Sequence, residues 1–318
     1  MRKHANHFGS HLRGYYRSRK IRRVIERDEI EIVGRNRNIY LSHESTVYSS
    51  QNTIDATCVS ARMLAMRCRI CGYESEAFAS TLVLSKFQVN YFRCGACRFI
   101  QTEPPYWLEE AYSEAIGALD VGVMLRNLHN AAVTSAVISL LFPNGTRFLD
   151  YAGGYGTLVR LMRDRGFDFY WSDRYAKNLH ARGFEQLPGS RYDLLTAYEV
   201  LEHLPEPLDD IRLMLDLADN VLVSTEVVPV PAPSPPNWWY YAVKGGQHIS
   251  FYAADSLQKI ASHFHVHLLS RGSYHLFTRK PQNSLLFRIA TSAQTVPIVN
   301  WLRKRESLIQ ADFERMAA

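Results

Sequence analysis

Four cysteines in two close pairs carry the most specific chemistry in this 318-residue chain. Two residues separate Cys68 from Cys71 and Cys94 from Cys97, and 22 residues lie between the pairs. This spacing lets both sulfurs of a pair turn toward one tetrahedral ion, while residues 81–92 can form intervening strands. A redox dithiol needs only one pair, and a structural disulfide does not suit a reducing cytosol. The pattern therefore predicts a structural zinc site.

A turn of small residues farther along the chain has the composition of a nucleotide-binding loop. Residues 148–157 read as a strand end, a turn and a helix start, and the small residues are Ala152, Gly153, Gly154 and Gly156. They let the backbone approach a ligand closely at the carboxyl edge of a sheet. A dinucleotide fingerprint would need a small residue at Thr157 or Val159, and no Gly-Lys-Ser/Thr of a phosphate loop follows. Both of those classes are therefore disfavoured.

A third reactive group follows a loop with five prolines in residues 228–236. It contains the aromatic side chains Trp238, Trp239, Tyr240 and Tyr241 and then Gln247 and His248. Aromatic density beside a ligand-binding edge predicts a wall for an acceptor molecule. Imidazole accepts a proton near neutral pH, so His248 is the expected catalytic group, with His203 as the substitute. Arg126 and Asn127 are further acceptor-binding candidates, on a helix that could act as a lid.

These residues need a scaffold, and the hydrophobic pattern predicts one from residue 146 onward. Short apolar runs at 147–151, 167–172, 192–198 and 220–225 alternate with amphipathic segments, which indicates an α/β, doubly wound parallel sheet. A helix over 254–263 and strands over 266–270 and 274–279 could close the sheet with a hairpin. Helices are also expected over 107–118 and 122–142, and two more, split near Pro297, over the tail.

Five segments follow from this pattern. They are a basic arm (1–50), the zinc module (51–105), a helical connector or lid (106–145), the α/β domain (146–280) and a helical tail (281–318). The net charge is +6, but residues 1–37 alone carry +7, so the basic character belongs to the arm. No apolar run reaches the roughly 18 residues of a membrane span, and the basic N-terminus does not resemble a secretory signal. A cytoplasmic protein is expected.

The turn after Asp150 resembles the first motif of class I S-adenosylmethionine-dependent methyltransferases, an acid followed by x-G-x-G-x-G, with Ala152 replacing the first glycine. Residues 167–173, ending in Asp173, are similar to strand two of that family. Residues 192–205, which contain Glu199 and end in Glu-His-Leu-Pro, are similar to its strand four and the turn after it. The order of the three motifs is that of the family. The resemblance implies a seven-stranded Rossmann-like methyltransferase sheet and S-adenosylmethionine as cofactor.

The resemblance also implies roles for the acidic residues. The acid at the Asp150 position serves the ammonium side of the methionine, and the glycine backbone faces the methionine moiety. Asp173 would accept hydrogen bonds from both ribose hydroxyls, which are strong because the acceptor is charged. Glu199 is a further cofactor candidate. Asp150 could instead be a turn former, and Glu199 and Glu202 could be solvated acids at a helix start.

The segment around His248 resembles the H-E-H-L-S-Y-F turn of zinc-containing sugar C-methyltransferases, which also carry an N-terminal four-cysteine module. Here Gly246 and Gln247 replace the first His and the Glu, and His248 remains. The chain also looks like bacterial methyltransferases of the polysaccharide-gene type. The resemblance implies methyl transfer to a sugar-like or other polar small molecule, with His248 as the acid/base or acceptor-orienting group.

Two other functions are considered. An RNA methyltransferase would combine a zinc module with the same sheet, and the basic arm could follow phosphates, although it lacks the interleaved aromatic residues of RNA-binding folds. A non-catalytic scaffold that binds zinc and S-adenosylmethionine would leave the aromatic segment and His248 without a task. The expected partner is therefore a small-molecule acceptor rather than a nucleic acid, and the oligomeric state is not predicted.

Overall fold

The computed structural model describes residues 66–112 and 120–318. The chain divides into two units, residues 1–59 and 60–318, and every described residue belongs to the second. The basic arm predicted over 1–50 and the first part of the zinc module, residues 51–65, lie outside the described residues. Among the described residues, no helix combines the length and apolar character that crossing a membrane requires.

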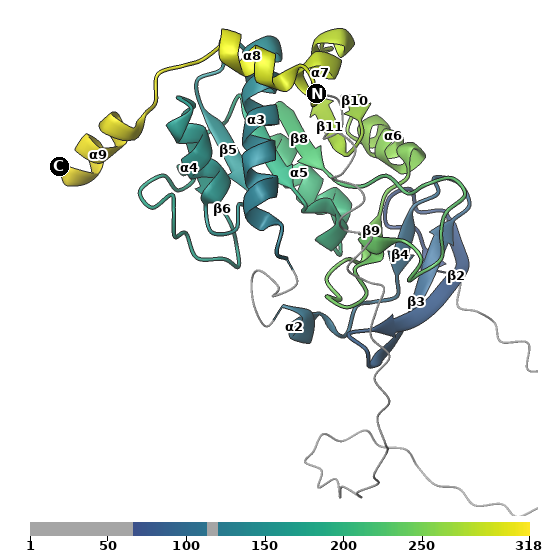
Figure 1. Cartoon of the computed structure of the whole chain (residues 1–318). Coiled ribbons are helices and arrows are strands. Elements are labelled where there is room, and N and C mark those ends of the chain that lie inside the picture. Colours follow the sequence, from purple (N-terminus) through teal and green to yellow (C-terminus); the bar gives the residue numbers. More distant parts are fainter. Residues whose placement is uncertain (1–65, 113–119) are drawn as a thin grey trace, which may run out of the picture. The chain divides into compact units, whose positions relative to one another are not determined.

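The larger of the two sheets, seen in Figure 1, has six strands and is mixed. Its strands, from one edge to the other, are β10 (His267–Arg271), β11 (Tyr274–Thr278), β8 (Asn220–Ser224), β7 (Leu194–Tyr198), β5 (Phe148–Tyr151) and β6 (Phe169–Ser172). The four strands from β8 to β6 are parallel, and β11 and β10 are antiparallel. The predicted parallel core and the closing hairpin are therefore confirmed.

The seventh strand implied by the family resemblance is not formed in the described part of the chain. Glu185 makes only an isolated parallel bridge to Trp171, beside β6. The residues that follow cannot continue a ladder, because Pro188 has no N–H and Gly189 has a left-handed φ of 69°. The expectation of seven strands is wrong at this edge, where one bridge replaces a strand.

Helices cover both faces of this sheet, which makes it doubly wound. On one face lie α3 (Val123–Leu141) and α4 (Thr157–Asp164), in one hydrophobic cluster with Phe148 and Leu194. On the other face, α5 (Pro207–Leu217) and α6 (Ala254–His263) share a cluster with Leu149 and Leu195. Adjacent strand residues thus enter opposite cores, as the period of two requires. In α3 the buried residues are Ala131 and residues 133–139, so only its first turns could belong to a lid.

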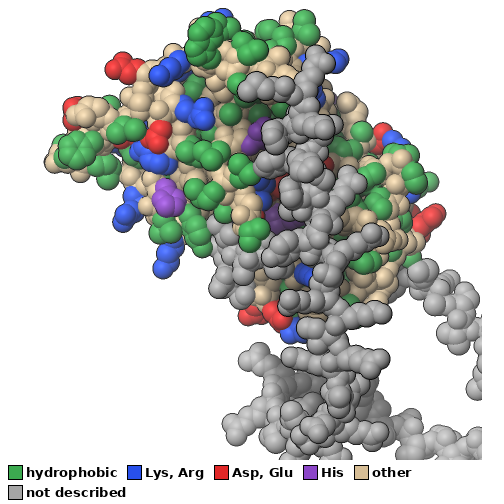
Figure 2. Space-filling model, in the orientation of Figure 1, with side chains coloured by type: hydrophobic (Ala, Val, Ile, Leu, Met, Phe, Trp, Pro, Cys, Tyr) green, Lys and Arg blue, Asp and Glu red, His purple; other side chains and the backbone are tan. Residues whose placement is uncertain are grey.

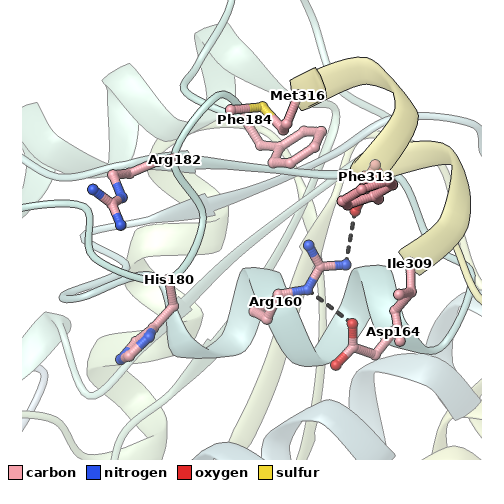
Figure 3. A pocket seen from close by; sticks show the side chains of 9 residues that line it. Arg160, Asp164, His180, Arg182, Phe184, Ile309, Phe313 and Met316 are labelled. Carbon is pink, nitrogen blue, oxygen red and sulfur yellow. Dashed lines mark hydrogen bonds and ion pairs between the residues drawn. The ribbon is translucent and has the colours of Figure 1, made fainter. Parts of the chain in front are cut away.

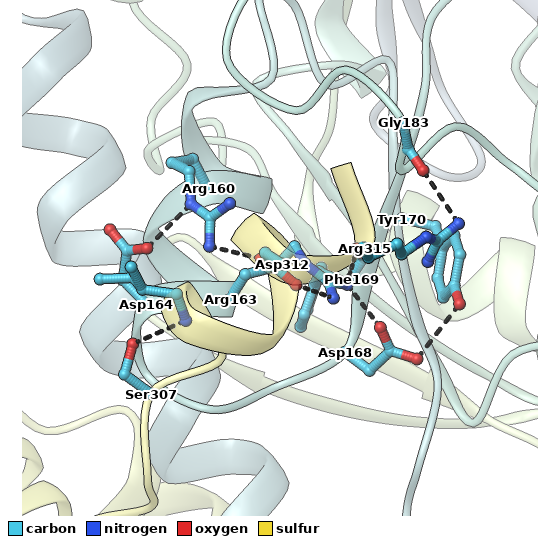
Figure 4. A network of polar contacts seen from close by, with 11 residues as sticks. Arg160, Arg163, Asp164, Asp168, Phe169, Tyr170, Gly183, Ser307, Asp312 and Arg315 are labelled. Atoms are coloured by element: carbon cyan, nitrogen blue, oxygen red, sulfur yellow. Dashed lines mark hydrogen bonds and ion pairs between the residues drawn. The ribbon is translucent and has the colours of Figure 1, made fainter. Parts of the chain in front are cut away.

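The C-terminal tail contains three helices rather than the two expected: α7 (Ser284–Ala290), α8 (Val296–Leu302) and α9 (Ile309–Ala317). Pro297 lies in the first turn of α8 and does not separate two helices, because a missing N–H is tolerated there. Asp312 attaches α9 to α4 through ion pairs to Arg160 at 2.7 Å and Arg163 at 2.6 Å (Figure 4).

A second, antiparallel sheet has the order β1 (Met66–Arg67), β2 (Glu74–Val83), β3 (Phe87–Cys94), β4 (Ile100–Thr102) and β9 (Ser250–Phe251). Strand β9 comes from the segment after the proline-rich loop and pairs with β4 through Ile100–Phe251 and Gln101–Ser250. The sheet of the cysteine module is therefore completed by residues about 150 positions later in the sequence. The short helix α2 (Leu108–Ala111) follows β4.

Candidate active site

The four predicted zinc ligands converge on one point. Their sulfur atoms all lie within 4.8 Å of one another, with Cys68–Cys97 and Cys71–Cys94 Sγ distances of 3.5 Å. A tetrahedral zinc with bonds of about 2.3 Å separates its sulfurs by about 3.8 Å. The N–H of Ile70 also donates to the Cys68 Sγ at 3.4 Å. The donor set and its spacing therefore fit a zinc ion.

The position of this cluster gives it a structural task. The buried cysteines Cys68, Cys94 and Cys97 belong to the same hydrophobic cluster as residues of α5 and α6. Next to them, Arg98 forms an ion pair with Asp255, in the first turn of α6, at 2.6 Å. An ion there would stiffen the edge of the second sheet, which packs against α5 and α6.

The glycine turn lies at the carboxyl end of β5, where ligands of parallel sheets bind. Ala152, Gly154 and Gly156 have positive φ values of 53°, 54° and 83°, and Gly156 caps α4. A Cβ on Gly153 would lie 2.6 Å from Oδ2 of Asp150, whereas one on Gly154 would meet nothing within 4 Å. The turn therefore packs tightly on Asp150 and leaves open space at Gly154 for a ligand.

The two predicted cofactor acids flank this turn. Asp150 is 3% exposed, its Oδ1 accepts a hydrogen bond from Thr196 Oγ1 at 2.8 Å, and burial raises its pKa to about 7. Asp173, directly after β6, accepts from the N–H of Gly154 at 2.9 Å through Oδ2. Its Oδ1 accepts from the N–H groups of Tyr175 and Ala176, both at 2.7 Å. Since each carboxylate oxygen has two acceptor positions, Oδ1 is filled, and Oδ2 keeps one position that could accept from a hydroxyl group.

Glu199 lies at the carboxyl end of β7 with a left-handed φ of 54°. Its Oε1 accepts from Ser224 Oγ at 2.7 Å, and burial raises its pKa. Arg126 is near enough for its charge to lower the Glu199 pKa, and it pairs with Asp120 at 2.6 Å. The side chain of Asn127 bonds to the carbonyl of its own helix at Val123. Of the two predicted residues on α3, Arg126 therefore interacts with the site and Asn127 caps a local turn.

His203 and His248 meet edge to face, with ring centroids 4.8 Å apart. His248 Nδ1 lies 2.7 Å from the Tyr240 carbonyl oxygen, and His203 Nδ1 lies 3.1 Å from that of Gln247. A carbonyl oxygen only accepts, so we assign a proton to both Nδ1 atoms, which leaves each Nε2 with a lone pair. Burial lowers the pKa of His203 to about 4 and that of His248 to about 3. Both rings are therefore neutral at pH 7.

Glu202 completes this cluster and was not predicted as a site residue. It is 0% exposed, so its interpretation as a solvated helix-start acid is wrong. No donor of the described residues meets hydrogen-bond geometry to either carboxylate oxygen, although the hydroxyls of Tyr240 and Thr225 lie near enough to lower the Glu202 pKa. One carboxylate oxygen lies within 4.8 Å of ring nitrogens of His203 and His248. Burial first, and then the charge of Glu199, raise the Glu202 pKa well above its ordinary value. Its position in the Glu-His-Leu-Pro turn was the available signal.

The aromatic segment does not form one wall. Tyr240 and Tyr241 are 0% and 1% exposed, and Tyr241 packs in the core of the second sheet, its ring centroid 4.7 Å from that of Phe251. Trp238 also packs there, while Trp239 is 68% exposed. Tyr240 alone borders the histidines, with its ring centroid 4.8 Å from that of His248.

Gln247 acts as a connector next to the histidines. Its side chain donates to the carbonyl of Ala111, in α2, at 2.8 Å, and its own carbonyl accepts from His203. The hydroxyl of Tyr112 lies 3.0 Å from His203 Nδ1. The segment just after α2 thus borders the histidine cluster through Tyr112.

A cavity of about 350 Å³ lies elsewhere, between α4, residues 180–184 and α9 (Figure 3). Its walls include Arg160, His180, Arg182 and the hydrophobic side chains of Phe313 and Met316. It contains none of the predicted site residues. The chemistry is therefore sought at the carboxyl edge of the parallel strands, where the predicted acids and histidines lie.

Comparison with known proteins agrees with this location. Residues 124–267 match a family described as "Methyltransferase domain". No protein of curated function matches the sequence. Among solved structures, an O-methyltransferase family protein from Burkholderia thailandensis is 16% identical with a TM-score of 0.38. That match covers 54% of this chain and 66% of the other, which is just under two thirds of its length.

Two further structures are similar at the same level. Human N-acetylserotonin methyltransferase in complex with SAM is 12% identical, with a TM-score of 0.35, over 55% of this chain and 66% of that chain. Magnesium protoporphyrin IX methyltransferase from Synechocystis PCC 6803 with bound SAH is 18% identical, with a TM-score of 0.36, over 54% and 90%. Residues 124–267 therefore match the methyltransferase-domain family, and the motifs within this stretch resemble those of the S-adenosylmethionine-dependent class.

Proposed function

We propose that this protein transfers a methyl group from S-adenosylmethionine to a polar small molecule, with a sugar-like compound such as a nucleotide-sugar as the acceptor class. The observation that carries the proposal is the group formed by the buried Glu202 and the half-buried His203 and His248, near the carboxyl end of β7. It belongs to the same strand edge as the glycine turn and Asp173. Donor and acceptor chemistry would thus meet at one edge.

The cofactor would be held by the turn after β5 and the acid after β6. The open side of Gly154 leaves room for a close ligand, Asp173 could accept from a ribose hydroxyl through the free position on Oδ2, and Asp150 and Glu199 line the same edge. When bound, S-adenosylmethionine supplies the methyl group: its C–S bond breaks, with the electron pair returning to sulfur, as the bond to the acceptor forms.

The acceptor must lose a proton when its hydroxyl or carbon is methylated. His248 Nε2 can take this proton, because Nδ1 is already bonded to the Tyr240 carbonyl. With a pKa of about 3, His248 is a weak base, and its ring is neutral at pH 7 before it takes the proton. A hydroxyl becomes a far stronger acid as its oxygen gains a methyl group, so a weak but well-placed acceptor suffices. His203 is the substitute in this role.

The surroundings favour a polar acceptor. Hydrogen-bond donors and acceptors near the histidines come from Arg126, Tyr112 and the carboxylate of Glu202. They lie close enough that the charge of Glu202 raises the pKa values of Tyr112 and Arg126, and the charge of Arg126 lowers that of His248. Figure 2 shows basic side chains interspersed with hydrophobic and acidic ones on the described face, which does not favour an RNA track. We propose that Cys68, Cys71, Cys94 and Cys97 hold a structural zinc beside this domain.

The test is transfer of label from methyl-labelled S-adenosylmethionine. The full chain is incubated with a panel of nucleotide-sugars and, separately, with total RNA. Label in the nucleotide-sugar fraction that His248→Asn reduces, while His263→Asn leaves it unchanged, is the expected result; His263 is an exposed residue of α6 outside the cluster. Label that enters only RNA would replace this function with RNA methylation.

A further inference from the structure

We propose that Glu202, His203 and His248 form a binding site for a divalent transition-metal ion, separate from the four-cysteine cluster. One ligand atom from each of the three residues lies within 4.8 Å of the others. Two residues come from the short helix after β7, Leu201–His203, and the third from the loop before β9. The site is thus assembled from two segments about 45 residues apart, by the same strand pairing that completes the second sheet.

The hydrogen bonds of both histidines prepare them as ligands. His248 donates from Nδ1 to the Tyr240 carbonyl, and His203 from Nδ1 to the Gln247 carbonyl. Metal-bound histidines typically make this second bond to a carbonyl or carboxylate, which fixes the ring and the tautomer. Each ring therefore keeps one nitrogen lone pair in a fixed orientation.

The carboxylate of Glu202 is the second observation that points to a bound cation. It is 0% exposed, and no donor of the described residues meets hydrogen-bond geometry to either oxygen, although the hydroxyls of Tyr240 and Thr225 lie near enough to lower its pKa. Two neutral hydroxyls do not balance a buried negative charge, and charged groups in such places are normally paired or bound to metal. The negative charge of Glu199 adds to the cost of this buried charge. The positive charge of the nearby Arg126 is paired with Asp120. A bound cation would therefore balance the negative charge of Glu202 that Arg126 leaves unpaired.

The ligand types select the class of ion. Two imidazoles and one carboxylate suit zinc, iron(II), cobalt(II) or manganese(II), whereas magnesium and calcium prefer oxygen ligands throughout. Three protein ligands also leave at least one coordination position open, as in catalytic rather than structural sites. An acceptor oxygen could fill that position and would lose its proton to water more readily there. With the ion bound, His248 Nε2 is a ligand, so the proton-acceptor role proposed for it above applies to the site without the ion. This catalytic use depends on the proposed methyl transfer, but binding of the ion does not.

The experiment is a titration of the metal-free full chain with cobalt(II). We expect two equivalents to bind in the wild type. One produces the sulfur-to-cobalt charge-transfer absorption of the cysteine cluster, and the other adds no such absorption because its ligands are nitrogen and oxygen. Glu202→Gln and His248→Asn should each lose the second equivalent, with affinity at least about 100-fold weaker, and keep the first. His263→Asn is the matched control and should bind both.

Three results would overturn the site. They are a wild type that binds only the sulfur-ligated equivalent, a second equivalent that increases the sulfur absorption, and variants of Glu202 and His248 that still bind two. The wild-type spectrum decides the question even if a variant does not fold. The titration contains no acceptor and no methyl transfer, so its failure would leave the proposed function standing. Equally, an absence of methyl transfer would not remove an observed second ion.

Discussion

Replacing Gly153 with alanine tests whether the turn after β5 is shaped by close contact with Asp150. The added Cβ would lie 2.6 Å from Oδ2 of Asp150 and 3.1 Å from Cδ1 of Trp171. Asp150 cannot move away easily, because it is 3% exposed and its other oxygen is held by Thr196 at 2.8 Å. The turn or the acid must shift, and both belong to the candidate cofactor site.

The expected size follows from overpacking in a rigid site, which costs about 1–3 kcal/mol. For a domain of roughly 150–250 residues this lowers Tm by about 2–10 °C. If the same distortion weakens the free energy of S-adenosylmethionine binding by about 1.4 kcal/mol, affinity for the cofactor falls about tenfold. Thermal unfolding and calorimetric titration with the cofactor measure the two effects separately.

Gly245→Ala is the matched control, because its Cβ would meet only the carbonyl oxygen of Ala242, at 3.6 Å. It should change stability by less than about 0.5 kcal/mol. A Gly153→Ala protein with wild-type Tm and cofactor affinity would refute the argument from close approach. Equal losses in both variants would show that the effect does not arise from Asp150.

Four other predictions concern the rest of the chain. Asp173→Ala should weaken S-adenosylmethionine binding at least about tenfold, since a charged hydrogen bond contributes about 1.5–3 kcal/mol; unchanged affinity by calorimetry would contradict the ribose assignment. His248→Asn should leave cofactor affinity nearly intact and lower turnover by about 10²–10⁴-fold, and full turnover would show that no proton acceptor is needed there. The folded pKa of His248 is lowered to about 3, so its stabilising effect is complete above the unfolded value and is lost as the pH falls below it. Between pH 6.5 and pH 5 the wild type should therefore lose about 1–2 kcal/mol more stability than His248→Asn, measured by urea unfolding, and parallel losses would exclude this linkage. Asp312→Ala removes the α9 partner of the buried Arg163, which keeps its ion pair with Asp168, and should cost about 1.5–3 kcal/mol, detected as lost amide protection over residues 309–317; protection equal to the wild type would mean that apolar packing alone holds α9.

The parallel strands could be located in the sequence because each of them is buried on both faces and appears as a short apolar run. The missing seventh strand is also a local matter, since Pro188 and Gly189 interrupt the segment after Glu185. The number of seven strands came from the family resemblance, whereas the residues of this segment indicate a break. In the tail, Pro297 does not break a helix, because proline is equally suited to a first turn.

The cofactor and zinc candidates were predictable for a different reason. Cysteine pairs carry their own spacing, and the acids after neighbouring parallel strands must meet at one edge, whatever the rest of the chain does. The structure brings the four sulfurs together and sets Asp173 against Gly154.

The sequence by itself therefore located the parallel strands, the four-cysteine set and the sheet edge that carries the cofactor candidates, because these depend on local periodicity, on spacing and on topology. The tertiary structure alone decided the acceptor side. Where β9 pairs with β4, Tyr241 is buried in the core of the second sheet. The same segment brings His248 against His203 and buries Glu202. No local pattern encodes this, since a loop residue faces solvent or a core according to which distant segment covers it. In this chain the covering segment lies about 150 residues away.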